Sequence, residues 1–377
     1  MANSLEEVTP VLIAQGLMAL RENAIMPRIV NMDYQDEARE KGDVVNIPIP
    51  SAVAATDVAP GLVPTAGTDV IPTKATVELN QWKEAKFQMT DTDIQKALDG
   101  IMPMQASEAV KSLGNAIDNY VHSLYTGIYS VSGVAGNTPF SSDLTEGTWA
   151  RKNLNNNLAP LDNRRYVLDP DAEANFLNVA TIINANQRGD TDGVREASMG
   201  RKIGFDFYMS QNVTTHVSTP FTAGAVTVNG ANVAGSDTIS LNKITNPTDL
   251  VKGDILTFAG DDQTYTVTAD VTLIIGNTTV GISPSLQVTT TGGEAVTLTA
   301  SHVVNLAMHR DAFALATRPL LDIGGGLGNI IQSATDPVTG LTLRLEISRQ
   351  HKQTQFAYDI LWGATLVRPE LADRSMG

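Results

Sequence analysis

Several short segments carry residues that could bind phosphate or metal, and each lacks a residue that the chemistry requires. Residues 200–204 (GRKIG) lack the spacing and the following Ser or Thr of a phosphate-binding P-loop. Residues 309–311 (HRD) occur as a tripeptide in kinase catalytic loops, but Ala316 stands where that loop has its metal-binding Asn. Residues 190–193 (DTDG) bring the glycine too early for a calcium-binding EF-hand loop and lack its distal Glu.

The remaining candidates for catalysis are equally incomplete. Residues 322–329 (DIGGGLGN) end in Asn where a dinucleotide-binding fingerprint has its last Gly, so we interpret them as a flexible loop. The histidines show no metal-ligand spacing; they are His122, His216, His302, His309 and His351. The chain has no cysteine, which excludes thiol catalysis, cysteine metal sites and disulfides. We therefore predict no catalytic residue, no cofactor, no metal site and no enzymatic activity.

Length and composition indicate a folded, acidic protein of more than one domain. The chain has 377 residues, of which 42% are hydrophobic, and it exceeds the ~250–300 residues at which single cores stop growing. Its formal net charge of −15 argues against wrapping nucleic acid, because phosphate neutralisation needs clustered Lys and Arg. The absence of cysteine suits folding in a reducing cytoplasm. No segment reads as a signal peptide or a membrane span, so we expect no membrane partner.

Among the elements that would position any site, one hairpin is unusual. Residues 42–50 and 73–89 alternate apolar with polar side chains, as strands do, and residues 51–72 between them are small and almost uncharged. A hairpin that closes on itself needs a turn of only ~2–5 residues, and a two-stranded arm is marginal alone in water. The alternatives are a mobile surface loop and an arm that lies against another copy of the chain. We favour the arm.

Two sets of apolar side chains are predicted to pack against protein. The hairpin residues predicted to contact a neighbouring copy are Val45, Ile47, Val58, Leu62, Val70, Val77, Leu79 and Trp82. Near the N-terminus, Thr9 followed by Pro10 is typical of a helix start. Ile13, Leu17 and Leu20 then recur on one helical face, and we expect this amphipathic arm helix to pack on protein rather than on lipid.

Downstream, helical and strand patterns alternate. A capping-box pattern at 90–93 predicts a short helix to residue 98. Apolar spacings of three and four predict a long helix over 105–129, roughly 37 Å in length at ~1.5 Å per residue. Further patterns predict helices at 144–154 and from 170, strands at 165–168, 202–209, 303–308, 341–348 and 355–361, and a helix-like segment at 312–317.

Residues 222–301 differ from the rest of the chain. Seventeen of these 80 residues are Thr, and short β-branched runs recur between turn residues. We predict a small all-β module inserted within another domain. Its two ends should lie close together, because an insertion then costs its host little closure entropy. Its net charge of −5, from two Lys against six Asp and one Glu, suits a solvent-facing position.

Several segments follow one another in an order that resembles a known family. They are residues 26–34 (MPRIVNMDY), 41–50 (KGDVVNIPIP), 86–91 (KFQMTD), the long helix, 200–207 (GRKIGFDF), 251–258 (VKGDILTF), 309–316 (HRDAFALA), 358–363 (YDILWG) and 367–371 (VRPEL). The chain thereby resembles the tailed-phage major capsid proteins that share the fold first seen in phage Hong Kong ninety-seven. More narrowly, it is similar to the coat-protein branch of the short-tailed Salmonella phage, which carries an inserted β-domain.

The resemblance implies an α+β fold with the parts of the phage major capsid fold. It assigns residues 1–40 to an N-terminal arm, 41–90 to an extended β-hairpin loop, 91–143 and 341–377 to a peripheral domain with the long spine helix, 144–221 and 302–340 to an axial domain, and 222–301 to an inserted β-domain. Residues 51–73 contain no Lys, so the cross-linking through a loop lysine that some members use is not expected.

The function implied by the resemblance is that of a major capsid protein. Such a protein self-assembles as hexamers and pentamers into an icosahedral shell, which encloses phage double-stranded DNA without binding it specifically. Because only about 40 residues precede the hairpin, a separate scaffolding protein is implied, together with a portal protein. The protein is expected in the virion and, during assembly, in the host cytoplasm. The Thr-rich module leaves one alternative, an extracellular β-rich surface or adhesin protein, against which the missing secretion signal argues.

Overall fold

The computed structural model describes most of the chain. The described residues are 9–33, 44–50, 53, 55, 72–92, 101–184, 199–222, 224–320, 329–337 and 339–377. Most of the hairpin tip at 51–72, residues 93–98 of the predicted short helix and the 190–193 segment lie outside them, as does the glycine-rich loop except Asn329. The described fold combines helices with several sheets, and most of its elements are strands.

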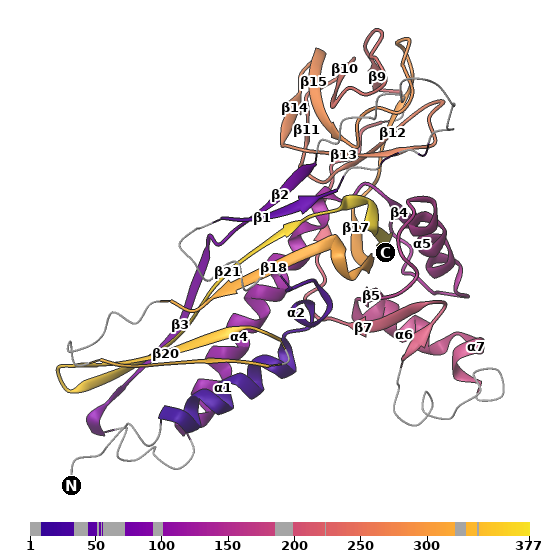
Figure 1. The fold of residues 1–377 in the computed structure, drawn as a ribbon. Helices are drawn as coiled ribbons and strands as arrows, with labels where there is room; N and C mark the ends of the chain where they lie inside the picture. Colours follow the sequence, from indigo (N-terminus) through magenta and orange to yellow (C-terminus); the bar gives the residue numbers. More distant parts are fainter. Residues whose placement is uncertain are drawn as a thin grey trace, which may run out of the picture.

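A long helix runs the length of one part of the molecule (Figure 1). This helix, α4 (Ile101–Ser123), begins four residues before the predicted start and passes into a 3-10 turn, η2 (Leu124–Gly127), near the predicted end. Its side chains at spacings of three and four are at most 2% exposed; they are Val110, Leu113, Ile117 and Val121. The N-terminal helix α1 (Thr9–Asn23) packs along it, so the periodicity of both segments reflects one shared core.

The two helices pack on a five-stranded antiparallel sheet. Its strands are β18 (Phe313–Arg318), β21 (Gln353–Leu366), β20 (Thr342–Gln350), β19 (Ile330–Thr335) and β3 (Gln81–Thr90). The prediction of a helix-like segment at 312–317 is wrong, because these residues form β18. Both faces of β18 are covered, and a continuous apolar run of this kind cannot be distinguished from a buried helix by periodicity.

A seven-stranded sheet forms the second part of the main body. Its strands are β4 (Val131–Gly133), β22 (Ala372–Met376), β17 (His302–His309), β5 (Arg164–Leu168), β7 (Phe205–Met209), β6 (Arg201–Lys202) and β8 (Thr215–His216). The helices near it are α5 (Thr145–Asn156), α6 (Pro170–Asn178) and α7 (Ala180–Ile183). One aromatic cluster joins this sheet to α6; it includes Phe140, Tyr166 of β5, Phe207 of β7 and Phe176 of α6.

Strand pairing crosses the predicted division between peripheral and axial segments. Strands β18 and β19 come from the predicted axial segment 302–340, yet they pair with β21 and β20 from segment 341–377. Conversely, β22 comes from the segment predicted as peripheral and pairs with β17 in the other sheet. Pairing between strands far apart in the sequence leaves no local pattern, so boundaries drawn from element order could not anticipate this exchange.

Residues 226–298 form sheets of their own at one end of the molecule (Figure 1). Six strands occur in the order β16 (Val296–Leu298), β12 (Ile255–Phe258), β13 (Thr264–Val267), β15 (Gly276–Ser283), β10 (Thr238–Lys243) and β9 (Val226–Val228). A small pair, β11 (Thr248–Leu250) with β14 (Val271–Leu273), accompanies them. Their apolar faces enclose a hydrophobic cluster separate from the main core, with Leu256, Tyr265 and Val280 fully buried.

Candidate functional site

The base of the predicted hairpin packs on the chain's own sheet. Strands β1 (Val44–Ile49) and β2 (Thr73–Glu78) pair antiparallel from Val44 opposite Glu78 to Ile49 opposite Thr73. The buried residues of this base are Val45, Ile47, Val77 and Leu79, which cluster with Ala314 and Ala316 of β18. The alternate β18 residues Phe313 and Leu315 face the main core, so the hairpin base lies on the opposite face of the sheet from α4.

The hairpin is shorter than the sequence pattern indicated. Residues 73–89 were expected as one strand, but the chain leaves the hairpin after β2 and continues as β3, which pairs with β21 over its whole length. The expectation that the hairpin has no partner within its own chain is therefore wrong for its base. The expectation was based on the length of residues 51–72 and on the marginal stability of an isolated two-stranded arm. Neither these grounds nor alternation of side chains says which part of the chain covers the buried face.

The eight predicted contact residues fall into three groups. Val45, Ile47, Val77 and Leu79 are covered by the chain itself. Trp82 belongs to β3, where its side chain is 62% exposed and its indole N–H donates to Asp359 at 3.4 Å. Val58, Leu62 and Val70 lie outside the described residues. Contact between these eight residues and a neighbouring copy stays a prediction.

A glycine with no role assigned from the sequence allows the hairpin base to lie close to the sheet. Gly363 lies in β21, and a Cβ built on it would come within 2.6 Å of the Glu78 carbonyl carbon and 3.1 Å of the Leu79 Cα. The backbone that leads out of β2 therefore rests directly on the Gly363 backbone. Glycine inside a strand is a recognised sign of such close backbone approach, and this signal was available in the sequence.

The N-terminal helix is attached to the main core by apolar contacts. The three residues predicted for its packing face behave as one face: Ile13 and Leu20 are buried and Leu17 is half-buried. On the same helix, a Cβ at Gly16 would lie 3.1 Å from Leu343 and 3.2 Å from Val110, so α1 approaches both the sheet and α4 closely. In the described chain the arm helix thus packs on its own subunit.

A buried carboxylate fastens the segment that follows α1. Asp118 on α4 accepts hydrogen bonds from the backbone N–H groups of Ile25 and Met26, each at 3.1 Å. Met26 begins the short helix α2 (Met26–Ile29), whose first N–H groups lack partners within the helix. Burial disfavours the charged carboxylate and raises the pKa of Asp118 from 3.8 to about 6, although these hydrogen bonds oppose the rise.

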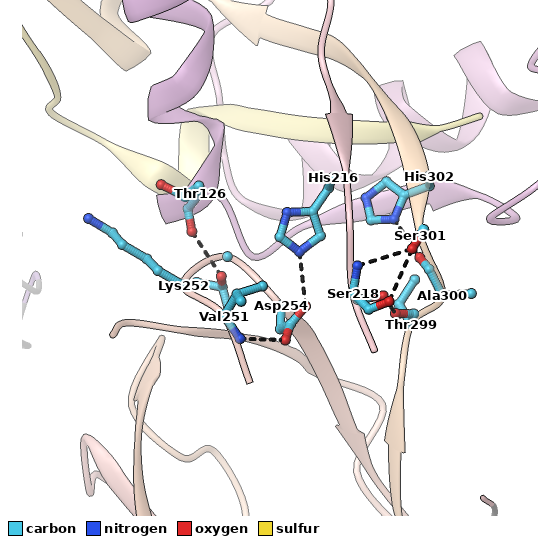
Figure 2. A network of polar contacts seen from close by, with 12 residues as sticks. Thr126, His216, Ser218, Val251, Lys252, Asp254, Thr299, Ala300, Ser301 and His302 are labelled. Atoms are coloured by element: carbon cyan, nitrogen blue, oxygen red, sulfur yellow. Dashed lines mark hydrogen bonds and ion pairs between the residues drawn. The ribbon is translucent and has the colours of Figure 1, made fainter. Parts of the chain in front are cut away.

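The two connections to residues 226–298 run side by side (Figure 2). Strand β8 precedes this region and β17 follows it, and the two pair through His216 opposite His302. Nearby, the Ser301 hydroxyl accepts from the Ser218 N–H at 3.0 Å and donates to the Ser218 carbonyl at 3.1 Å. The entry and exit of the region are therefore adjacent, as an insertion with little closure entropy requires.

One guanidinium joins three parts of the chain at this junction. The buried Arg374 of β22 donates to the carbonyl of Gly253 at 2.7 Å and to the carbonyl of Thr126 at 3.1 Å. It also donates to the hydroxyl of Thr266 at 3.2 Å and lies 5.1 Å from the ring centroid of Tyr125. Burial lowers the pKa of Arg374 to about 9, which leaves it charged near neutral pH.

A second set of polar groups completes the junction. His216 bonds through Nε2 to the Asp254 carboxylate at 2.9 Å and through Nδ1 to the Tyr125 hydroxyl at 3.1 Å. The same carboxylate accepts the Val251 N–H at 2.8 Å (Figure 2). Burial lowers the pKa of His302 to about 4, so this ring is neutral near pH 7 and serves as a structural group.

Residues 309–311, which were considered for a kinase-like site, have structural partners instead. His309 accepts the Asp311 N–H at 3.2 Å, the Asp311 carboxylate accepts from the Asn31 amide at 2.7 Å, and Arg310 pairs with Asp33. Within the described residues, no group of three or more His, Asp or Glu side chains could hold a metal ion. No helix in the described part of the chain has the length and apolar character of a membrane span.

No protein-family model matches the chain. No curated protein sequence matches it either. The fold, by contrast, is similar to solved phage structures. A structure from Mycobacterium phage Che8 matches with a TM-score of 0.54 and 13% identity, covering 94% of this chain and 91% of that one.

Two further solved structures are described as phage capsids. The capsid of cyanophage P-SCSP1u has a TM-score of 0.49 and 12% identity, covering 89% of this chain and 84% of that one. The mature capsid of bacteriophage PhiM1 has a TM-score of 0.49 and 10% identity, covering 94% of this chain and 87% of that one. At such identities the likeness is one of fold alone.

Proposed function

We propose that this chain is a phage major capsid protein that self-assembles into an icosahedral shell around double-stranded DNA. The observation that supports this most strongly is the fold shared with the Mycobacterium phage Che8 structure over 94% of the chain. That likeness leaves only 6% of the chain uncovered. The shell role needs no catalytic group, which agrees with the structural partners found for residues 309–311.

The proposed mechanism is geometric. The hairpin base is fixed on one face of the five-stranded sheet, and Gly363 and β18 hold it there, so residues 51–72 start from a rigid support. Subunits that reach across neighbours bury apolar surface that one copy alone leaves in water, and repetition by symmetry closes the shell. The net charge of −15 suits a wall that confines DNA without gripping it.

The finer assignment is to the coat-protein branch of the short-tailed Salmonella phage. It is supported by the separate core of residues 226–298 and by the adjacent connections at β8 and β17. In this proposal residues 222–301 form an inserted domain on the shell. The partners are further copies arranged as hexamers and pentamers, a separate scaffolding protein and a portal protein. The location is the virion, after assembly in the host cytoplasm.

Expression of the full chain with the scaffolding protein of its phage tests this proposal. Sedimentation and negative-stain electron microscopy should reveal closed shells, or oligomers of capsomer size when scaffolding protein is omitted. The chain without scaffolding protein is the matched control. If only monomers sediment at high concentration with scaffolding protein present, the chain is not a shell-forming protein.

A further inference from the structure

A surface pocket lies where the hairpin base meets the loop after α5. Its volume is about 420 Å³, and its apolar walls include Ile47, Phe313, Val367 and Leu371. Arg368 and Glu370 also line it, at the start of the turn η4 (Pro369–Leu371). Within the part of the chain that the structure describes, neither of these charged side chains makes a hydrogen bond or an ion pair. His309 and Asp311 line it as well, and the Asp311 carboxylate is bound by the Asn31 amide. The pocket therefore combines apolar walls with polar groups, and Arg368 and Glu370 are two charges of opposite sign on its lining.

An exposed leucine projects beside this pocket in a conformation that leucine rarely adopts. Leu158 directly follows the C-cap of α5 and has a φ of +56°, and the Ala159 N–H bonds back to the Leu154 carbonyl at 2.9 Å. This helix-ending motif is usually built with glycine, which adopts positive φ without strain. The Leu158 side chain is nevertheless 89% exposed, so neither helix termination nor core packing accounts for it.

The leucine and the pocket are complementary to each other. Leu158 lines the pocket rim, and Leu161, three residues on, is also 63% exposed. A two-fold contact between copies uses the same patch twice, so that each copy presents both a projection and a recess. In the same contact, Arg368 of one copy can face Glu370 of the other, which gives each unpaired charge an opposite partner. Both the apolar shape and the charges therefore favour a second copy of this chain as occupant.

We propose that the Leu158 loop of one copy inserts into the pocket of a second copy, with Arg368 and Glu370 pairing across the contact. This contact is isologous, which means that both copies use the same residues. Because Ile47 of the hairpin base lines the pocket, the contact also involves the hairpin base. The proposal rests on the proposed function in requiring that copies associate, and it adds which residues of the chain do so.

Charge exchange in the full chain tests the pairing. Arg368→Glu and Glu370→Arg should each raise about ten-fold the concentration at which half of the protein sediments as oligomers or shells. The double variant R368E/E370R should return to within about three-fold of the wild type, because the pairs are restored with reversed sign. If the double variant is as weak as the single ones, or if the single ones match the wild type, the proposed pairing is wrong.

Replacement of the leucine separates assembly from folding. Leu158→Gly relieves the positive φ, so its Tm should rise by about 1–3 °C while self-association weakens about ten-fold. Leu161→Ala provides a milder variant at the edge of the contact, with a smaller loss. Unchanged self-association of Leu158→Gly would overturn the contact while leaving shell formation by the wild type intact. Failure of the wild type itself to associate would overturn both this contact and the proposed function.

Discussion

At the scale of single residues, two buried charges join segments that are far apart in the sequence. Arg374 holds together the C-terminal strand, the turn after α4 and the β12–β13 region, and its pKa of about 9 keeps it charged near neutral pH. Removal of one member of such a buried network leaves the other polar groups without hydrogen-bond partners, so the loss in the free energy of unfolding is large. Asp118 differs, because its pKa of about 6 places its titration close to neutrality.

The contribution of Asp118 to stability should depend on pH. A carboxyl whose folded-state pKa is raised from 3.8 to about 6 contributes its full stabilisation below pH 3.8 and loses it as the pH rises through about 6. At ~1.36 kcal/mol per pKa unit this difference is worth about 3 kcal/mol. We expect the free energy of unfolding of Asp118→Asn, relative to wild type, to rise by up to about 3 kcal/mol from about pH 4 to about pH 7.

Urea titrations at several pH values measure this difference. Asparagine has one oxygen and cannot reproduce every acceptor of Asp118, so Asp118→Asn should carry an additional loss that is constant with pH. The exposed Asp262, substituted as Asp262→Asn, is the matched control for the removal of one carboxyl group. Parallel profiles for Asp118→Asn would show that this carboxyl does not titrate in the expected range.

At the scale of elements, whether a helix or strand could be predicted from sequence depended on whether one or both of its faces are buried. Helix α4 has one buried face, so its spacing of three and four was visible, and the existence of the helix was predicted correctly. Strand β18 is buried on both faces and rich in Ala and Leu, so its pattern indicated a helix. The hairpin base was recognised as paired strands, but its support by β18 and Gly363 depends on contacts between residues distant in sequence.

The position of the hairpin should depend on the absence of a side chain at residue 363. Gly363→Ala would drive a Cβ into the Glu78 carbonyl, and backbone cannot move aside as a flexible side chain can. We expect a loss of about 2–3 kcal/mol in the free energy of unfolding, as overpacking of a close contact gives. Urea denaturation measures the loss, and limited proteolysis should show faster cleavage near β2.

Gly16→Ala is the control for this substitution. Its added Cβ would meet the Leu343 and Val110 side chains at 3.1 and 3.2 Å, which can adjust, and a helical glycine replaced by alanine gains about 1 kcal/mol in helix propensity. We expect this variant to remain within about 1 kcal/mol of the wild type. An equal loss for both glycine variants would mean that the hairpin base does not depend on the Gly363 contact.

At the scale of the whole molecule, residues 222–301 should fold without the rest of the chain. They contain a hydrophobic cluster of their own, and 80 residues exceed the size at which disulfides or metals become necessary. We expect the isolated segment to show a β-type circular dichroism spectrum, dispersed amide NMR signals and a stability of a few kcal/mol. The isolated segment lacks the hydrogen bonds from Arg374, so we expect it to be less stable than the same residues in the full chain.

A core variant of the same segment is the control. Tyr265 is fully buried, and its hydroxyl donates to Asp261 at 2.6 Å and accepts from the Gln287 N–H at 2.9 Å. Tyr265→Ala should therefore abolish cooperative unfolding of the segment. A collapsed, poorly dispersed spectrum for the unaltered segment would mean that it depends on its host and is not an autonomous domain.

The sequence predicted the general architecture better than it predicted the contacts between residues that are distant along the chain. Composition identified the β-rich region, and the order of segments predicted the phage capsid fold; the described fold is similar to the structure from Mycobacterium phage Che8. The buried polar residues that join distant segments could not be identified from the sequence. Asp118 is one Asp among many acidic residues, and nothing local marks it as the carboxylate that caps α2. Similarly, the partners of Arg374 lie 108 or more residues away from it along the chain, so no motif could reveal them.

The position of β22 has a consequence for the order of events during synthesis. This strand lies between β4 and β17, all five of its residues are buried, and it carries Arg374. Until residues 372–376 leave the ribosome, the seven-stranded sheet has a gap and the junction lacks its guanidinium. Such late closure through distant contacts slows folding. The seven-stranded sheet and the junction with residues 226–298 are therefore completed only after residues 372–376 have left the ribosome.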